Sequence, residues 1–255
     1  MLIINCVVYA WQDWQTVRET LGGGASLFDW IDGFSTTLDD LAWLVLALIY
    51  EFETAWASDE GGPPRLQSVR HAAVVLCYAV ILHTFYVYAQ DLRGVYQVEP
   101  AASLASPCEI ADQGQYFLYN QSYTPIDAGN CARLGSGAEF FRMSADSVTD
   151  VHGLITAMIQ AWASVVESGL WIMIVSFLAI MTLMQERGIA EGVLFRTADT
   201  LNICCYAMIA LISCYWAWMN WPIYLWDNFL WTAAFAAIEM NLVRWRREMR
   251  VEAAG

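Results

Sequence analysis

Two long uncharged stretches constrain this chain more than any other feature. Residues 71–90 (HAAVVLCYAVILHTFYVYAQ) and residues 200–226 contain no Asp, Glu, Lys or Arg. Each stretch is long enough to cross a bilayer as a helix, which takes about 20 residues. We therefore interpret the chain as an integral membrane protein.

The composition supports this interpretation. Charged residues make up only 15% of the chain, against about 25% in an average soluble domain. The chain also has 13 Trp and 12 Tyr, whose amphipathic rings settle at the membrane–water interface. A formal net charge of −14 argues against nucleic-acid binding, which requires a basic surface, whereas cations are compatible with it.

Three further apolar segments are interrupted by carboxylates. They are residues 38–57 with Glu51 and Glu53, residues 151–185 with Glu167, and residues 228–247 with Glu239. We predict an all-α bundle of about five transmembrane helices, with a small irregular extracytoplasmic domain, stapled by a disulfide, between helices 2 and 3. The predicted regions are an N-terminal extracytoplasmic or interfacial segment (1–37), helices 1 and 2 (38–90), the extracytoplasmic domain (91–150), helices 3 to 5 (151–247) and a cytoplasmic tail (248–255).

The predicted disulfide joins Cys108 to Cys131. These are the only two of the seven Cys residues between residues 91 and 150, and no His lies near them in the sequence. A zinc site is therefore disfavoured, and an extracytoplasmic disulfide is the better interpretation.

The distribution of Arg predicts the orientation. Most of the 12 basic residues lie in 58–70, 186–198 and 244–255. By the positive-inside rule these segments are cytoplasmic, so the C-terminus lies in the cytoplasm and the N-terminus and residues 91–150 lie outside. We predict a plasma or inner membrane protein, and the Cys108–Cys131 pair then falls in the oxidising compartment.

Polar residues recur at helical spacing on the predicted spans. Spacings of three or four residues show which side chains share a helix face. On the third predicted helix one face carries Thr149, His152, Thr156, Gln160, Ser164 and Glu167. Such a face either lines a hydrated path or hydrogen-bonds packed helices together, and the sequence leaves both interpretations open.

The ionisable groups of the predicted spans are expected to lie at two depths in the membrane. Counting 1.5 Å per residue from Glu186 places Glu167 roughly 30 Å away, near the outer boundary, where His83 could pair with it. Glu51 and Glu239 fall at the inner level, where nearby Arg residues could pair with them. The candidate ion path is therefore Glu167, His83, Gln160, Glu51 and Glu239, and structural ion pairs or hydrogen bonds are the alternative.

The leading functional hypothesis is a homo-oligomeric channel or transporter for cations or protons, since five helices enclose little volume and a pore would form between subunits. The alternative is an accessory or scaffold subunit of a larger membrane complex. No catalytic motif or Gly-rich phosphate loop is present, so we predict no enzyme activity and no cofactor. The sequence does not determine whether a metal is bound.

Overall fold

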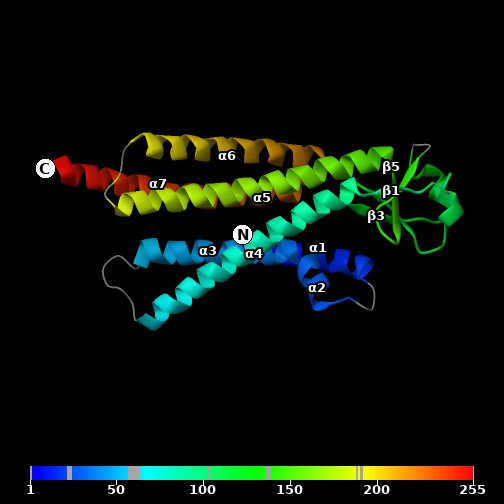
Figure 1. Ribbon diagram of the computed structural model, residues 1–255, viewed down its shortest axis with the longest axis horizontal. Helices are drawn as coiled ribbons and strands as arrows, with labels where there is room; N and C mark the ends of the chain where they lie inside the picture. Colours follow the sequence, from blue (N-terminus) through cyan, green and yellow to red (C-terminus); the bar gives the residue numbers. More distant parts are fainter. Residues whose placement is uncertain are drawn as a thin grey trace. The chain divides into compact units, whose positions relative to one another are not determined.

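The structure is a computed structural model that describes residues 2–21, 25–56, 64–102, 104–135, 139–187, 189 and 192–254. It divides into two compact units, whose elements are labelled in Figure 1. The helical unit comprises Met1–Val87 and Glu167–Gly255, and the sheet unit comprises Tyr88–Val166. Each unit is described by itself below.

The described part of the chain is mostly helical. The α-helices are α1 (Leu2–Thr20), α2 (Leu27–Gly33), α3 (Ser35–Trp56), α4 (Pro64–Tyr96), α5 (Val151–Glu186), α6 (Val193–Trp218) and α7 (Pro222–Ala254). Helices α3 to α7 contain most of the five segments in which the sequence predicts helices, and the stretch 200–226 is divided between α6, the turn at 219–221 and the start of α7. The N-terminal segment, which is predicted to be interfacial, also forms helices, and α1 packs against α3.

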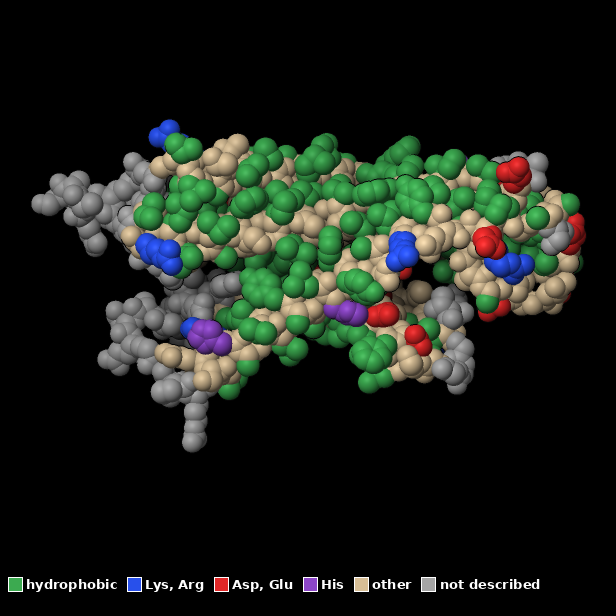
Figure 2. Space-filling view, in the orientation of Figure 1, with side chains coloured by type: hydrophobic (Ala, Val, Ile, Leu, Met, Phe, Trp, Pro, Cys, Tyr) green, Lys and Arg blue, Asp and Glu red, His purple; other side chains and the backbone are tan. Residues whose placement is uncertain are grey.

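Among the described residues, three helices are long and apolar enough to cross a membrane. They contain Gln67–Tyr96 of α4, Val151–Met184 of α5 and Val193–Trp218 of α6. Most side chains in these stretches are not buried, and Figure 2 shows hydrophobic side chains covering much of the visible helical surface. Apolar surface of this extent is typical of a lipid-facing protein, which is consistent with an integral membrane protein.

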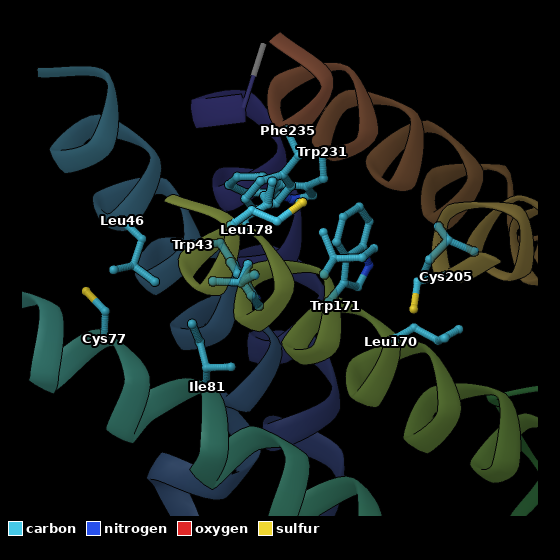
Figure 3. Close-up of a cluster of buried hydrophobic side chains, with 14 of the residues drawn as sticks. Trp43, Leu46, Cys77, Ile81, Leu170, Trp171, Leu178, Cys205, Trp231 and Phe235 are labelled. Atoms are coloured by element: carbon cyan, nitrogen blue, oxygen red, sulfur yellow. The ribbon is translucent and has the colours of Figure 1, made fainter. Parts of the chain in front are cut away.

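An aromatic cluster forms the centre of the helical unit. It consists of Trp43 on α3, Trp171 on α5, and Trp231 and Phe235 on α7, which Figure 3 shows among the other core side chains. The Phe235 ring lies 5.6 to 6.2 Å from each of the three indole rings, measured between centroids. Aromatic pairs at this separation stabilise a packed core by more than the burial of their apolar surface alone. Phe235 therefore helps to hold α7 against α3 and α5.

The described residues of the sheet unit form five short strands in the order β1-β4-β5-β2-β3. Of the described pairings, only that of β2 with β5 is parallel. The strands are β1 (Glu99–Pro100), β2 (Tyr116–Tyr119), β3 (Ser122–Pro125), β4 (Phe140–Arg142) and β5 (Ser147–Asp150), with 3₁₀ turns at Pro107–Ile110 and Cys131–Arg133. The predicted irregular domain therefore has a sheet. Strands of two to four residues are too short to give a readable alternation pattern.

The disulfide and a small apolar core hold the sheet unit together. Cys108 and Cys131 are bonded, as the sequence predicts, and Cys131 is buried in the core. The core residues are Phe117, Ile126, Cys131, Phe140 and Val148. A core this small gains from a covalent link, because closing the loop restricts the unfolded chain.

A two-residue turn joins β2 to β3. Its central residues, Asn120 and Gln121, both have positive φ angles, of 50° and 61°. This is the backbone signature of a type I′ hairpin turn, in which Asn-Gly is the favoured pair. The Asn120 side-chain oxygen accepts a 2.6 Å hydrogen bond from the Gln160 amide, which fixes the turn against α5.

Candidate functional site: a buried acidic centre

Four carboxylates from three helices lie close enough to interact inside the helical unit. Asp39 and Asp40 come from α3, Glu167 from α5 and Asp227 from α7, and together we call them the acidic centre. Asp227 interacts electrostatically with Asp40 and Glu167, and Asp39 interacts with Asp40 and Asp227. The centre is thus a cluster of four acidic groups, of which Asp40 is buried and the other three are partly buried.

Glu167 accepts hydrogen bonds at both oxygens. The indole nitrogen of Trp216 lies 2.7 Å from Oε2, and the Asn228 amide nitrogen lies 2.6 Å from Oε1. Asn228 is oriented in turn by the Trp171 indole, which donates to its side-chain oxygen at 3.2 Å. Glu167 is therefore held in one position by α6 and α7.

The other three carboxylates also accept bonds from neutral donors. Asn5 donates to Oδ1 of Asp227 at 2.7 Å, which brings α1 to the centre. The Trp231 indole donates to Oδ1 of Asp40 at 3.2 Å. The Trp43 indole donates to Oδ2 of Asp39, also at 3.2 Å.

No positive charge balances the centre among the described residues. The donors described for its four carboxylates are all neutral: amide and indole nitrogens, with further side-chain bonds from Cys6 to Asp40, from Thr84 to Asp39 and from Tyr9 to Asp227. Two oxygens, Oδ1 of Asp39 and Oδ2 of Asp40, are buried without a hydrogen-bond partner in the described part of the chain. Buried carboxylates in an apolar medium are costly when ionised and unpaired, so this centre favours bound protons or cations.

A second carboxylate lies farther along α7. Glu239 Oε1 accepts hydrogen bonds from Asn202 at 2.6 Å and from the Tyr206 hydroxyl at 2.8 Å, both on α6. Glu239 also lines an open cavity of about 440 Å³. The other described residues lining this cavity are Ala236, Met240, Val243 and Arg244.

A stripe of side chains along α7 connects the two acidic levels. Asp227, Trp231, Phe235 and Glu239 follow one another at intervals of four residues, so each lies beside the next, and the stripe winds about a third of a turn around the helix from Asp227 to Glu239. At 1.5 Å per residue, Asp227 and Glu239 are separated by roughly 18 Å along the helix. The rings of Trp231 and Phe235, which belong to the aromatic cluster, therefore lie between the Asp227 and Glu239 carboxylates along α7.

Asp13 on α1 is a further acidic group in the helical unit. Thr37 donates to Asp13 Oδ2 through both its hydroxyl (2.6 Å) and its backbone N–H (2.9 Å), which joins α1 to α3. Burial raises the pKa of Asp13 above its usual value, and the two bonds from Thr37 oppose that shift.

The residues of the predicted ion path fall in different places. Glu167 belongs to the acidic centre and Glu239 to the second level. His83 Nε2 lies 3.0 Å from Oδ1 of Asp32, whereas the partners of Glu167 are Trp216 and Asn228.

The remaining two residues of that path are Gln160 and Glu51. Gln160 is in the sheet unit, bonded to Asn120. The side chain of Glu51 lies outside the described residues.

Sequence reasoning missed three members of the acidic centre as site residues. Asp39 and Asp40 stand at the start of an apolar run, where carboxylates commonly cap a helix. Asp227 stands in a short Trp-rich hairpin between two spans, where it looks solvent-exposed. The sequence feature that could have identified the centre was the pair of adjacent Asp residues at the start of the first predicted span.

The described residues contain no group of three or more His, Cys, Asp or Glu side chains arranged to hold a metal ion. Comparisons with protein-family models, with curated proteins and with solved structures find no match for this chain.

Proposed function

We propose that this chain is a membrane channel or transporter for protons or other cations, with the acidic centre and Glu239 as two stations of its path. The observation that carries the proposal is the cluster of Asp39, Asp40, Glu167 and Asp227, whose hydrogen-bond donors in the described part of the chain are all neutral. Ionisable groups inside a membrane protein are expensive and usually serve transport or proton relay. A purely structural role would be served better by uncharged residues.

The order of the acidic and aromatic side chains along α7 supports a gated path. The two acidic stations on α7 are separated by Trp231 and Phe235, which pack against Trp43 and Trp171. An apolar constriction between two polar sites blocks ions when it is dry and passes them when it opens. In this proposal the aromatic cluster is the barrier, and movement of α7 against α3 and α5 opens it.

The proposed topology has five spans, α3 to α7. Helices α3 and α7 are interrupted by carboxylates and would cross with their polar faces turned inward. The N-terminus and the sheet unit would lie outside and the C-terminus in the cytoplasm. A homo-oligomer supplies the wider path that five helices alone do not enclose.

The topology has a direct test. A Cys introduced at Gln115 should react with a membrane-impermeant thiol reagent from outside, and one at Ala254 should not. Both probes are placed in a background from which exposed Cys204 and Cys214 have been removed. Labelling of Ala254 and not of Gln115 would reverse the orientation.

The function is tested in liposomes that contain the purified protein. Wild-type protein should pass protons or monovalent cations down an imposed gradient. Asp227→Asn keeps the acceptor for Asn5 but removes the charge, so flux should fall. Glu109→Gln, an exposed carboxylate of the sheet unit, is the matched control and should leave flux unchanged. Wild-type liposomes that pass no cation or proton would refute the proposal.

One observation favours a second candidate, a scaffold subunit of a membrane complex. Trp218 at the end of α6 is 80% exposed, and Trp226 on α7 is 43% exposed. Large exposed indoles are common anchors of protein–protein contacts as well as of lipid interfaces. A stable heteromeric complex on purification from the native membrane, with no flux from this chain alone, would favour the scaffold.

A further inference from the structure

We infer that the proton is the transported species and that the carboxyl group of Asp40 binds it in the resting protein. This inference rests on the proposed function for its transport step, whereas the bound proton itself can be observed without transport. Asp39 and Asp40 each have one buried oxygen without a hydrogen-bond partner among the described residues, and Asp40 is the more deeply buried of the two side chains.

Asp40 is buried, with only 4% of its surface exposed. Its Oδ1 accepts the bond from Trp231, and its Oδ2 is buried without a hydrogen-bond partner among the described residues. An ionised carboxylate there would leave one oxygen unsolvated in an apolar interior. A proton on Oδ2 neutralises the group and leaves the Trp231 bond intact.

The neighbours of Asp40 make protonation more favourable. The titratable groups that interact with it are Cys6, Tyr9, Asp39 and Asp227. Asp227 in turn interacts with Glu167, and no basic group appears among these neighbours. Negative charge on one carboxylate favours a proton on the next, as in carboxylate pairs that share one proton.

The donor set suits a proton better than a metal cation. Sodium, calcium or magnesium requires several oxygens converging on one point. Here indole and amide N–H groups point at the carboxylates of Asp40, Glu167 and Asp227, and their positive ends repel a cation. A proton needs a single oxygen, which Oδ2 of Asp40 supplies.

The proposed transfer runs between Asp40 and Asp227. The O–H bond on Asp40 breaks as an O–H bond forms on the Asp227 carboxylate, directly or through hydronium from water. No electrons are exchanged and no other reactant is required. Negative charge moves to Asp40, which then takes up the next proton.

Infrared spectroscopy of the full-length protein in liposomes tests the bound proton. Wild-type protein near neutral pH should show the carbonyl stretching band of a protonated carboxylic acid. Asp40→Asn should reduce the intensity of that band by the contribution of Asp40, and Glu109→Gln should leave the band unchanged. A band that persists at full intensity in Asp40→Asn overturns the assignment to Asp40, whatever the flux.

Flux measurements test the transported species. Asp40→Asn should lower proton flux roughly 100-fold, the scale on which a positioned proton-transfer group contributes. Sodium or potassium flux equal to proton flux would overturn the inference and leave the proposed function standing. Absence of any flux, with the infrared band present, would refute the function and leave the bound proton standing.

A second variant covers the case in which Asp40→Asn fails to fold. Trp231→Phe keeps the carboxyl group but removes the donor to Oδ1. The carbonyl band should then move to higher frequency, because the C=O group has lost its hydrogen bond. An unshifted band would show that the protonated group is not Asp40 and would overturn the inference.

Discussion

The side-chain amide of Gln160 donates a 2.6 Å hydrogen bond to the side-chain oxygen of Asn120, 40 residues away in the sequence. The bond anchors the β2–β3 turn to α5 within the sheet unit. Gln160 is 4% exposed, so its side chain is committed to this contact.

We predict that Gln160→Leu destabilises the sheet unit by about 1–3 kcal/mol, because it leaves the Asn120 oxygen without its donor. Hydrogen exchange of the β2 and β3 amides measures the change. Gln160→Glu, which keeps the shape but cannot donate when ionised, should act in the same direction. If Gln160→Leu lowered ion flux while the β2 and β3 amides stayed equally protected from exchange, Gln160 would belong to the ion path.

The turn itself offers a stabilising substitution. Gln121 has a φ of 61°, a left-handed conformation that costs an L-residue about 1–2 kcal/mol and glycine almost nothing. Gln121→Gly should therefore stabilise the sheet unit by up to about 1 kcal/mol, seen as slower exchange of the β2 and β3 amides. Gln121→Val is the contrasting variant and should speed exchange. Equal exchange rates for both variants would argue against the type I′ turn.

Loss of the disulfide should weaken the same unit. Cys108 and Cys131 are 23 residues apart, and closing a loop of this size contributes about 3 kcal/mol. Replacing both residues by Ser should make the sheet unit sensitive to protease at low concentration. Cys204→Ser, at an exposed free Cys on α6, is the control and should have no such effect. Resistance equal to wild type would mean that the apolar core is sufficient.

Glu167→Gln should lower both stability and flux. The substitution puts an amide nitrogen against either the Trp216 indole or the Asn228 amide, so one donor faces another and about 1–3 kcal/mol is lost. Unfolding in detergent measures the first effect and liposome flux the second.

A double variant separates the two effects of Glu167→Gln. Adding Trp216→Phe removes one of the conflicting donors, so part of the stability should return. The negative charge is still missing, so flux should stay low. Recovery of flux together with stability would mean that Glu167 acts through folding alone.

The sequence predicted the helices well because their signal is local. Residues 71–90 and 200–226 have no formal charge, and α4 and α6 contain most of both stretches. The disulfide was equally accessible, since Cys108 and Cys131 are the only Cys residues in a polar segment. Composition over about 20 residues decides such features, and no long-range contact is needed.

The sheet and the acidic centre were not predictable in the same way. Strand β2 pairs with β5, whose partner residues lie about 30 positions later, and neither strand exceeds four residues. Asn5 meets Asp227 across 222 residues. Such pairings depend on how whole helices pack, and helical spacing within one segment reports only which residues share a face.

The short link between α6 and α7 bears on how this chain is made. Only residues 219–221 join the two helices, and Asn220 takes a left-handed backbone conformation with a φ of 66°. In the proposed five-span topology, α6 and α7 would enter the bilayer together as this hairpin, and Glu239 would meet Asn202 and Tyr206 during insertion. The carboxylate would then reach the hydrocarbon with its hydrogen-bond partners already in place.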